Sequence, residues 1–233
     1  MQEPATLGSV GAAPLGLYED EEERMPEPSG QARLVGQIVS DGYWFTLRDD
    51  RIDFQSDCFV IRDRGRVILV DPLPMRKKDL APLGLVEAIC LTASCHERSA
   101  WRYRRLLKVP VWAPEGGVDF EETPDHWYRA GDLLPGGLLA VHAPGPTEAH
   151  YAFCLARNGG VLFCADLLTN AGGAGLAFVP GEYQDEPART RESVRQLLAL
   201  RFEVLCPNHG DPVRHEVKEA IARALERDQA PSG

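Results

Sequence analysis

The chain has 233 residues, of which 44% are hydrophobic, so it is long enough to bury a substantial core and is neither mainly disordered nor fibrous. Its 35 acidic residues outnumber 25 basic ones, and the resulting formal net charge of −10 disfavours nucleic-acid partners. No apolar run approaches the roughly 18 residues of a membrane-spanning helix, and the N-terminus lacks signal-peptide features, so we expect a cytoplasmic protein without a membrane partner.

Residues 1–30 differ in composition from the rest of the chain. They contain four prolines, four glycines and an acidic run at 19–23, with no sustained hydrophobic period. This composition predicts a flexible or draped acidic arm, which is either a solvated tail or a contact with a partner subunit. The remaining residues, 31–233, are predicted to form one domain, because no internal repeat divides them.

From residue 34 onward, short apolar runs alternate with turns, a pattern typical of β-strands. The runs 58–62 and 66–71 are joined by Asp63, Arg64 and Gly65, which predicts a β-hairpin. Several of the runs are apolar on both faces, so we expect other layers to cover them on each side. The other predicted strands are 34–39, 43–47, 87–92, 138–143, 150–156, 160–166 and 202–207.

Helices are predicted between and after these strands. Apolar residues share one face of 99–108 and of 187–200, and Asp211 and Pro212 are expected to cap and open the last helix. The stretch 169–184 is predicted to be a long loop, and loops of that length in compact domains are often functional. The order of elements indicates two stacked sheets with helices outside.

The six cysteines form no CxxC pair, and most lie inside apolar runs. We therefore interpret them as reduced, buried side chains, with the exception of Cys95, which lies in a polar segment. A disulfide framework and a structural zinc ribbon are not expected.

Side chains able to bind a metal ion follow four of the predicted strands, where a sheet passes the chain to a loop. These segments are 92–98, 144–150, Asp166 and 207–210. Taken in chain order, they resemble the metallo-β-lactamase superfamily. The hairpin ending at Asp71 resembles the family's opening hairpin, and segments 91–98, 144–147, 161–166 and 206–210 stand where the family has HxHxDH, the PGHT turn, a strand ending in Gly-Asp, and a closing HG.

The resemblance covers about residues 56–213 and implies an α/β (α+β) fold, a four-layer αββα sandwich. It also implies one or two metal ions, usually zinc and sometimes iron or manganese, that activate water for hydrolysis. Fold alone selects no substrate among the lactams, thioesters, phosphodiesters and lactones known for the family.

The chain departs from the family motif at most metal-ligand positions. The HxHxDH positions fall in order on Ala93, Cys95, Glu97 and Arg98, and the histidine of PGHT is Pro146, whereas Asp166 and His209 are intact. Glu97, Asp166 and His209, with Cys95, could hold a single Zn²⁺, Fe²⁺ or Mn²⁺ ion.

Two hypotheses follow from this donor set. In the first, the protein is a metal-dependent hydrolase with one ion and catalytic carboxylates at Asp166 and Glu97, slowly cleaving a small-molecule ester, thioester or phosphodiester. In the second, Arg98 pairs with Glu97 or Asp166 and replaces the ion. The protein would then bind no metal and act as a non-catalytic binding or scaffold module for a protein partner or a second copy of itself.

The remaining candidate residues are expected to line the site. His96 is one residue out of the motif's register, so it is either an alternate donor or a surface residue, and Asp71 is expected to tighten the loop beneath the site. His150 is expected to pack rather than to catalyse. A thiol nucleophile at Cys95 is disfavoured, because adjacent residues after a strand rarely point at one another.

Overall fold

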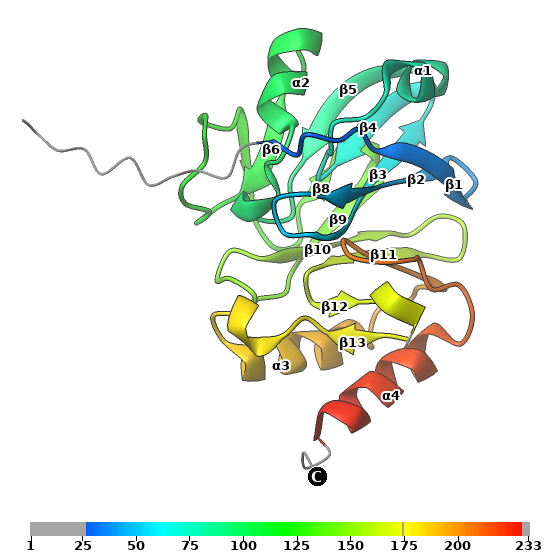
Figure 1. Ribbon diagram of the computed structural model, residues 1–233, viewed down its shortest axis with the longest axis vertical. Helices are drawn as coiled ribbons and strands as arrows, with labels where there is room; N and C mark the ends of the chain where they lie inside the picture. The colour runs from blue at the N-terminus through cyan, green and yellow to red at the C-terminus, as the bar shows by residue number, and fades with distance from the viewer. Residues whose placement is uncertain (1–26, 174, 230–233) are drawn as a thin grey trace, which may run out of the picture.

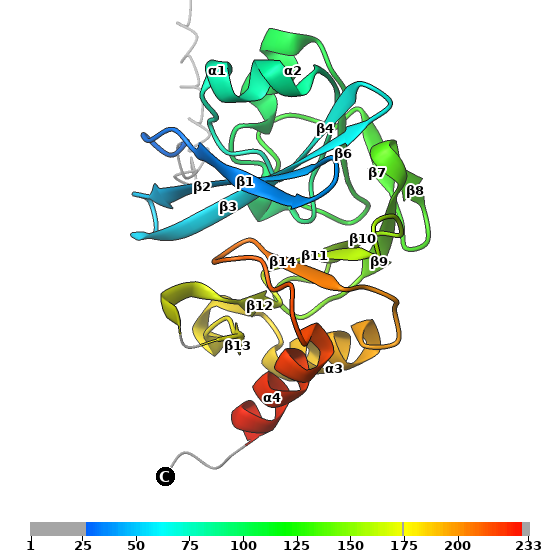
Figure 2. The same cartoon turned by 90° about the vertical axis from the view of Figure 1, so that its right-hand side faces the viewer.

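Two β-sheets lie face to face, with helices on both outer sides, in the computed structural model (Figures 1 and 2). The structure describes residues 27–173 and 175–229, so nearly all of the predicted arm 1–30 lies outside the described residues. The larger sheet has the order β1-β2-β3-β4-β5-β6-β7. Its strands are β1 (Arg33–Val39), β2 (Gly42–Asp49), β3 (Phe54–Asp63), β4 (Arg66–Val70), β5 (Leu85–Cys90), β6 (Val111–Pro114) and β7 (His126–Tyr128).

The smaller sheet has the order β14-β11-β10-β9-β8, and a separate pair, β12 and β13, lies beside it. Its strands are β8 (Leu133–Leu134), β9 (Leu138–His142), β10 (Tyr151–Leu155), β11 (Val161–Ala165) and β14 (Val204–Pro207), and the separate pair is β12 (Leu168–Thr169) and β13 (Ala177–Phe178). The helices are α1 (Lys77–Leu80), α2 (Ala100–Leu107), α3 (Pro187–Leu197) and α4 (Val217–Gln229).

Successive side chains of the buried strands point to opposite faces of the sheet, and this explains the layers. In β3, Phe59 and Ile61 face the smaller sheet, while Val60 faces the core shared with α1 and α2. The Phe59 ring lies 5.1 Å from the ring of Phe163 on β11, which joins the two sheets. Because both faces are covered, β11 and residues 58–61 of β3 are apolar without alternation, as expected from their sequences.

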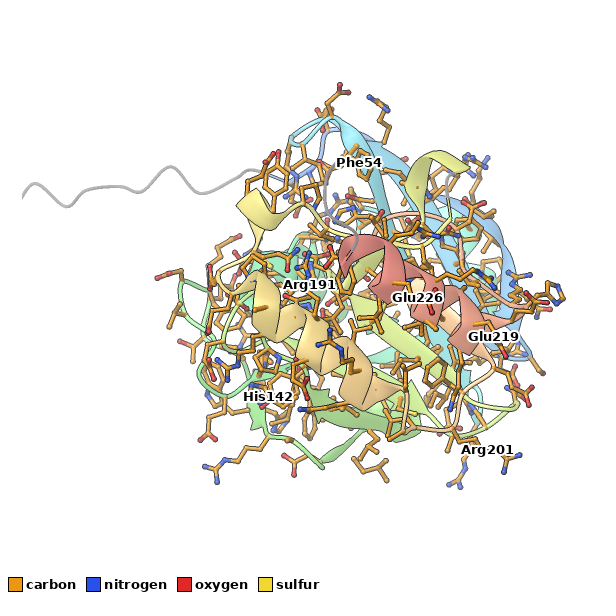
Figure 3. All side chains as sticks on the ribbon, turned by 90° about the horizontal axis from the view of Figure 1, so that it is seen from below. Phe54, His142, Arg191, Arg201, Glu219 and Glu226 are labelled. Carbon is orange, nitrogen blue, oxygen red and sulfur yellow. The ribbon has the colours of Figure 1, made fainter. Side chains whose placement is uncertain are left out.

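The outer face of the smaller sheet is covered by α3 and α4 (Figure 3). Val194 on α3 and Ile221 on α4 pack on Leu162 and Cys164 of β11. Arg191 on α3 also binds Asp228 on α4 through paired contacts of 2.6 Å. The four layers confirm the predicted αββα sandwich.

The predicted hairpin is confirmed, since β3 and β4 pair antiparallel with Asp63 opposite Arg66. Arg64 and Gly65 both adopt positive φ angles, 47° and 79°, which a two-residue turn between such strands requires.

Two predicted elements were wrong in detail. The last helix begins at Val217 and not at Pro212, because Val213 exchanges backbone hydrogen bonds of 2.8 and 2.9 Å with Leu205 and extends the pairing of β14. The stretch 169–184 is not a plain loop, because it contains most of the β12–β13 pair, whose Leu168 and Phe178 join the core beneath α3 and α4.

All six cysteines are free, and only Cys95 is exposed, as predicted. No helix within residues 27–173 and 175–229 is long and apolar enough to cross a membrane.

Strand direction places the candidate residues together. Strands β4 and β5 run parallel, and so do β11 and β14. Because parallel strands end at the same edge of a sheet, the loops that follow these four strands meet at one edge of the sandwich.

Candidate metal centre

Asp166, directly after β11, is the residue around which the site is built. One carboxylate oxygen, Oδ2, lies 2.9 Å from His96 Nε2, and the other, Oδ1, lies 3.3 Å from His209 Nε2. The Asp166 side chain is 21% exposed, so the site is open at its mouth. Two imidazoles therefore converge on one carboxylate.

His209 follows β14 and is oriented by the backbone of β3. Its Nδ1 lies 2.7 Å from Gln55 O, and because a carbonyl oxygen can only accept, Nδ1 carries the proton and donates. Its Nε2 faces Asp166 Oδ1, a buried oxygen that accepts no hydrogen bond of suitable geometry. The second ring nitrogen is thus directed at the carboxylate.

His96 is buried, with 3% exposure, and lies within the site. Its Nδ1 is 2.7 Å from Thr92 Oγ1, whose own hydroxyl donates to Asp71 Oδ2 at 2.6 Å. His96 Nδ1 is therefore the donor of this pair. Its Nε2 is left to face Asp166.

The central place of His96 was not expected, because His96 is one residue out of the motif's register. In the structure Ser94–His96 form a 3₁₀ turn, and this turn brings His96 round to Asp166. A polar hydroxyl at Thr92, four residues earlier, was the one sequence signal that could have suggested a partner for the ring.

Asp71 lies beneath the site. Its carboxylate is completely buried and accepts the Thr92 N–H at 2.8 Å and the Asn208 amide at 2.7 Å. It therefore links the ends of β4, β5 and β14.

The histidines and carboxylates of the site shift one another's pKa values toward the charged forms. Burial alone would raise the pKa of Asp166, but the neighbouring His96 and His209 outweigh it and hold that pKa well below its ordinary value. Burial would likewise lower the pKa of His96, but Asp166 and the nearby Cys95 and Asp71 hold it well above its ordinary value. Without a metal ion, an imidazolium–carboxylate pair forms the centre of the site.

His150 has a structural role, as predicted. Its Nδ1 donates to Ala143 O at 2.9 Å, and its Nε2 accepts the backbone N–H of Asp166 at 3.3 Å. Burial lowers the pKa of His150 to about 4, so the ring is neutral. It holds the backbone of Asp166 and has no lone pair left for a ligand.

The structure does not bring Glu97 into this group. Its Oε2 accepts the Trp101 indole N–H at 2.6 Å and the Glu121 backbone N–H at 2.8 Å. The proposed role of Glu97 as a metal ligand and catalytic carboxylate therefore has no geometric support. The 3₁₀ turn that brings His96 inward places Glu97 on the side of α2.

The expected contact of Arg98 with Glu97 or Asp166 was wrong. Arg98 is 7% exposed, adopts a positive φ of 39°, and donates through Nη1 to the backbone oxygens of Asp57 at 2.7 Å and Asp71 at 3.2 Å. The side chain ties β3 to the end of β4 behind the site. The alternative in which Arg98 replaces the metal ion therefore loses the contact that motivated it.

Cys95, His96 and Asp166 each offer one ligand atom, and these atoms all lie within 4.8 Å of one another. The exposed thiol of Cys95 stands at the mouth of this group. Two other motif positions contribute no ligand atom, since Ala93 is fully buried and Pro146 is buried with its carbonyl bonded to Asp185 N at 3.1 Å.

Cys95, His96 and Asp166 form one group of possible ligands, and His209 approaches the same carboxylate from its other oxygen. Two ligands of a tetrahedral zinc lie about 3.3–3.4 Å apart when each is about 2.0–2.1 Å from the ion. The 3.3 Å separation of His209 Nε2 from the unpaired Asp166 Oδ1 matches this spacing. Both histidines also donate their other ring N–H to a protein oxygen, which is the usual support of a metal-binding imidazole.

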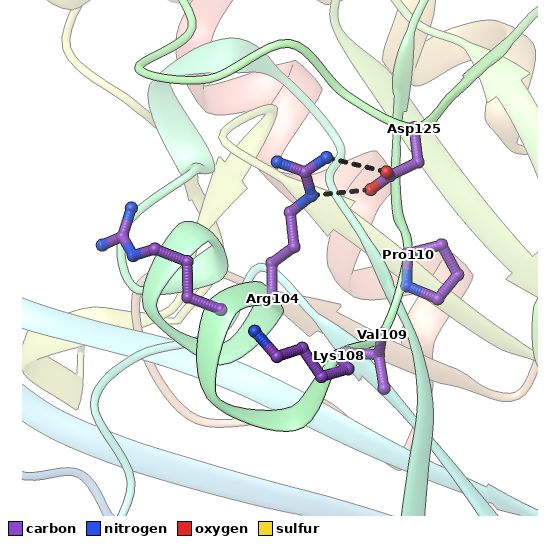
Figure 4. A pocket seen from close by; sticks show the side chains of 6 residues that line it. Arg104, Lys108, Val109, Pro110 and Asp125 are labelled. Carbon is purple, nitrogen blue, oxygen red and sulfur yellow. Dashed lines mark hydrogen bonds and ion pairs between the residues drawn. The ribbon is translucent and has the colours of Figure 1, made fainter.

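A separate surface hollow lies at the C-terminal end of α2 (Figure 4). Arg104, which lines it, donates two hydrogen bonds of 2.9 and 2.8 Å to the Asp125 carboxylate. Its arginines are already paired with carboxylates, and none of the metal-centre side chains lines it.

Comparison with known proteins identifies the class. The family model described as the metallo-beta-lactamase superfamily matches residues 40–209, which is most of the chain. The chain therefore belongs to the metallo-β-lactamase superfamily. No curated protein matches its sequence significantly.

Solved structures share the fold at low sequence identity. A metallo-β-lactamase from Erythrobacter litoralis is 16% identical, with 85% of this chain and 93% of that chain covered and a TM-score of 0.64. A metallo-β-lactamase family protein from Thermus thermophilus is 19% identical, with 82% and 80% covered and a TM-score of 0.63. The metallo-β-lactamase FIM-1 from Pseudomonas aeruginosa, in its mono-zinc form, is 14% identical, with 87% and 98% covered and a TM-score of 0.63.

Proposed function

We propose that the protein is a single-metal hydrolase whose ion is held by Cys95, His96, Asp166 and His209. The observation that carries the proposal is the convergence of two imidazole Nε2 atoms on one carboxylate, each ring fixed by a hydrogen bond from its Nδ1. Sulfur, nitrogen and carboxylate donors together suit zinc better than magnesium or calcium. His96 takes the place that the sequence analysis assigned to Glu97.

A bound ion would lower the pKa of a water molecule and polarise the group to be cleaved. The chain's own residues would prepare for this chemistry. His150 and the Asp71–Thr92 pair hold Asp166 and His96 in place, and a small-molecule substrate would approach from the side of the exposed Cys95. His96 must give up the proton on Nε2 before it can bind a cation, so metal affinity should fall with falling pH.

An ester, a thioester or a phosphodiester remains the proposed substrate class, and turnover should be slow because the site holds one ion. Six free cysteines without a disulfide support a reducing compartment such as the cytoplasm.

Metal content after purification without chelator tests the proposal. We expect near-stoichiometric zinc, iron or manganese, lost in Asp166→Ala and His209→Ala but retained in Glu97→Gln, the neighbouring control. Zinc at 100 times its Kd should stabilise the native chain by about 2.7 kcal/mol. Metal-free protein with a melting temperature that neither Zn²⁺ nor Mn²⁺ changes would overturn it.

Hydrolysis is then assayed on matched ester, thioester and phosphodiester substrates, with the Asp166→Ala variant as the blank. We expect cleavage of one class that disappears in this variant. Metal binding without cleavage of any class would leave a metal-binding protein and refute the hydrolase.

A further inference from the structure

Asp57 lies directly behind the loop that carries His209. The residue is completely buried, although its side chain is ionisable. Its backbone N–H donates to Asn208 O at 2.8 Å, and its Oδ2 accepts the Gly210 N–H at 2.6 Å. One residue of β3 thus binds both neighbours of His209 in the chain.

The ring of His209 is anchored to the same strand. Its Nδ1 donates to the backbone oxygen of Gln55, two residues before Asp57. Because both anchors belong to β3, the position of the loop and the direction of the ring depend on one rigid element. The loop has little freedom of its own, since a Cβ on Gly210 would lie 2.3 Å from the Asn170 backbone.

The partners of the Asp57 side chain explain why the residue is a carboxylate. Trp44 Nε1 donates to Oδ1 at 2.7 Å, Gln55 Nε2 lies 3.1 Å from both oxygens, and Gly210 donates to Oδ2. An ionised carboxylate accepts at both oxygens and carries no proton. A neutral amide would set its NH₂ group against either the Trp44 or the Gly210 N–H.

We propose that Asp57 is a positioning residue of the metal centre, holding loop 208–210 so that His209 Nε2 faces Asp166. This inference rests on the proposed function and extends it to a residue that does not contact the ion. Partners that orient metal-binding histidines typically contribute about 10–100-fold to metal affinity.

The test compares Asp57→Asn with Asp49→Asn. Asp49 is a matched control, because it is also completely buried but accepts hydrogen bonds from Arg51 and Ser56 and not from the 208–210 loop. The zinc Kd is measured for the native chain and both variants by competition with a chromophoric chelator. We expect Asp57→Asn to weaken zinc binding at least about tenfold and Asp49→Asn to change it less than threefold.

A readout without metal accompanies the affinity. In metal-free protein labelled with ¹⁵N-glycine, a short hydrogen bond to a carboxylate should place the Gly210 amide proton downfield of ordinary glycines. We expect it to move upfield in Asp57→Asn and to stay in Asp49→Asn. A merely structural loss of stability would not separate the two variants in this way.

Because Asp57→Asn could prevent folding, the double variant Trp44→Phe/Asp57→Asn is a second route. Removing the indole N–H allows the amide to turn its oxygen to Gly210 and its NH₂ away. We expect a zinc Kd within threefold of the native value. A tenfold loss in this folded double variant would overturn the proposal.

The experiments distinguish failure of the proposed function from failure of the role of Asp57. A native chain that binds no zinc refutes the proposed function and, with it, the role of Asp57. If the native chain binds zinc and Asp57→Asn binds it equally tightly, the role of Asp57 alone is refuted. A Gly210 amide at an ordinary position in the native chain also refutes that role.

Discussion

The two sheets supply the metal centre in different ways. The smaller sheet contributes Asp166 and His209, each just after a strand. The larger sheet contributes the segment 92–98, in which Ser94–His96 form a 3₁₀ turn. In it, Cys95 and His96 face Asp166, while Glu97 and Arg98 turn away.

The difference shows how far a motif can be transferred. A residue directly after a strand inherits the direction of that strand, so its position survives divergence. A seven-residue segment with a 3₁₀ turn and a positive φ at Arg98 sets its own directions. Spacing alone could not predict which of its side chains enter the site.

The largest expected effect tests whether Arg98 belongs to the fold and not to the site. Arg98→Met should cost about 3–4 kcal/mol of unfolding free energy, because two buried carbonyls lose a charged donor. Urea unfolding without metal measures the cost, and Arg102→Met is the control, because Arg102 is more exposed and, among the residues that the structure describes, pairs with Glu27 alone. Zinc affinity should change less than threefold in the folded fraction, and a loss of zinc binding would return Arg98 to the site.

A second prediction concerns pH and the smaller sheet. The pKa of His150 is about 4 in the folded chain, against an ordinary value of 6.5. Between these pH values the His150 side chain is therefore protonated in the unfolded chain and neutral in the folded chain. His150 should therefore lower stability progressively as pH falls from 6.5 to 4, by about 3 kcal/mol in total, and should have no such effect above pH 6.5.

Urea unfolding from pH 4 to 7 in the presence of EDTA measures this dependence. His150→Gln can donate to Ala143 O and accept from Asp166 N without titrating, so its pH slope should be smaller by one proton. His142→Gln serves as the control. An unchanged slope in His150→Gln would show that the ring is not neutral in the folded chain.

The smallest expected effect tests whether Glu97 lies outside the metal centre. Glu97→Ala should cost about 1–2 kcal/mol, since the Trp101 and Glu121 N–H groups lose their acceptor. Its zinc Kd should stay within threefold of the native value. A tenfold weaker Kd, measured by chelator competition, would place Glu97 among the ligands after all.

Much of the fold was predictable because it rests on local patterns. Apolar runs on both faces marked β3, β10 and β11, and the Asp63–Gly65 turn marked a hairpin. The start of α4 was not predictable, because Asp211 and Pro212 are good helix-opening residues. There, the pairing of Val213 with Leu205 outweighed the local preference.

By itself, the sequence determined the layered fold and the placing of Asp166 and His209 after strands, since these depend on residue type and on order along the chain. Only the tertiary structure decided that His96 joins Asp166, that Glu97 and Arg98 leave the site, and that Asp57 supports His209. These contacts join residues 41 to 153 positions apart or depend on the turn of one short loop. No spacing rule encodes the direction in which such side chains point.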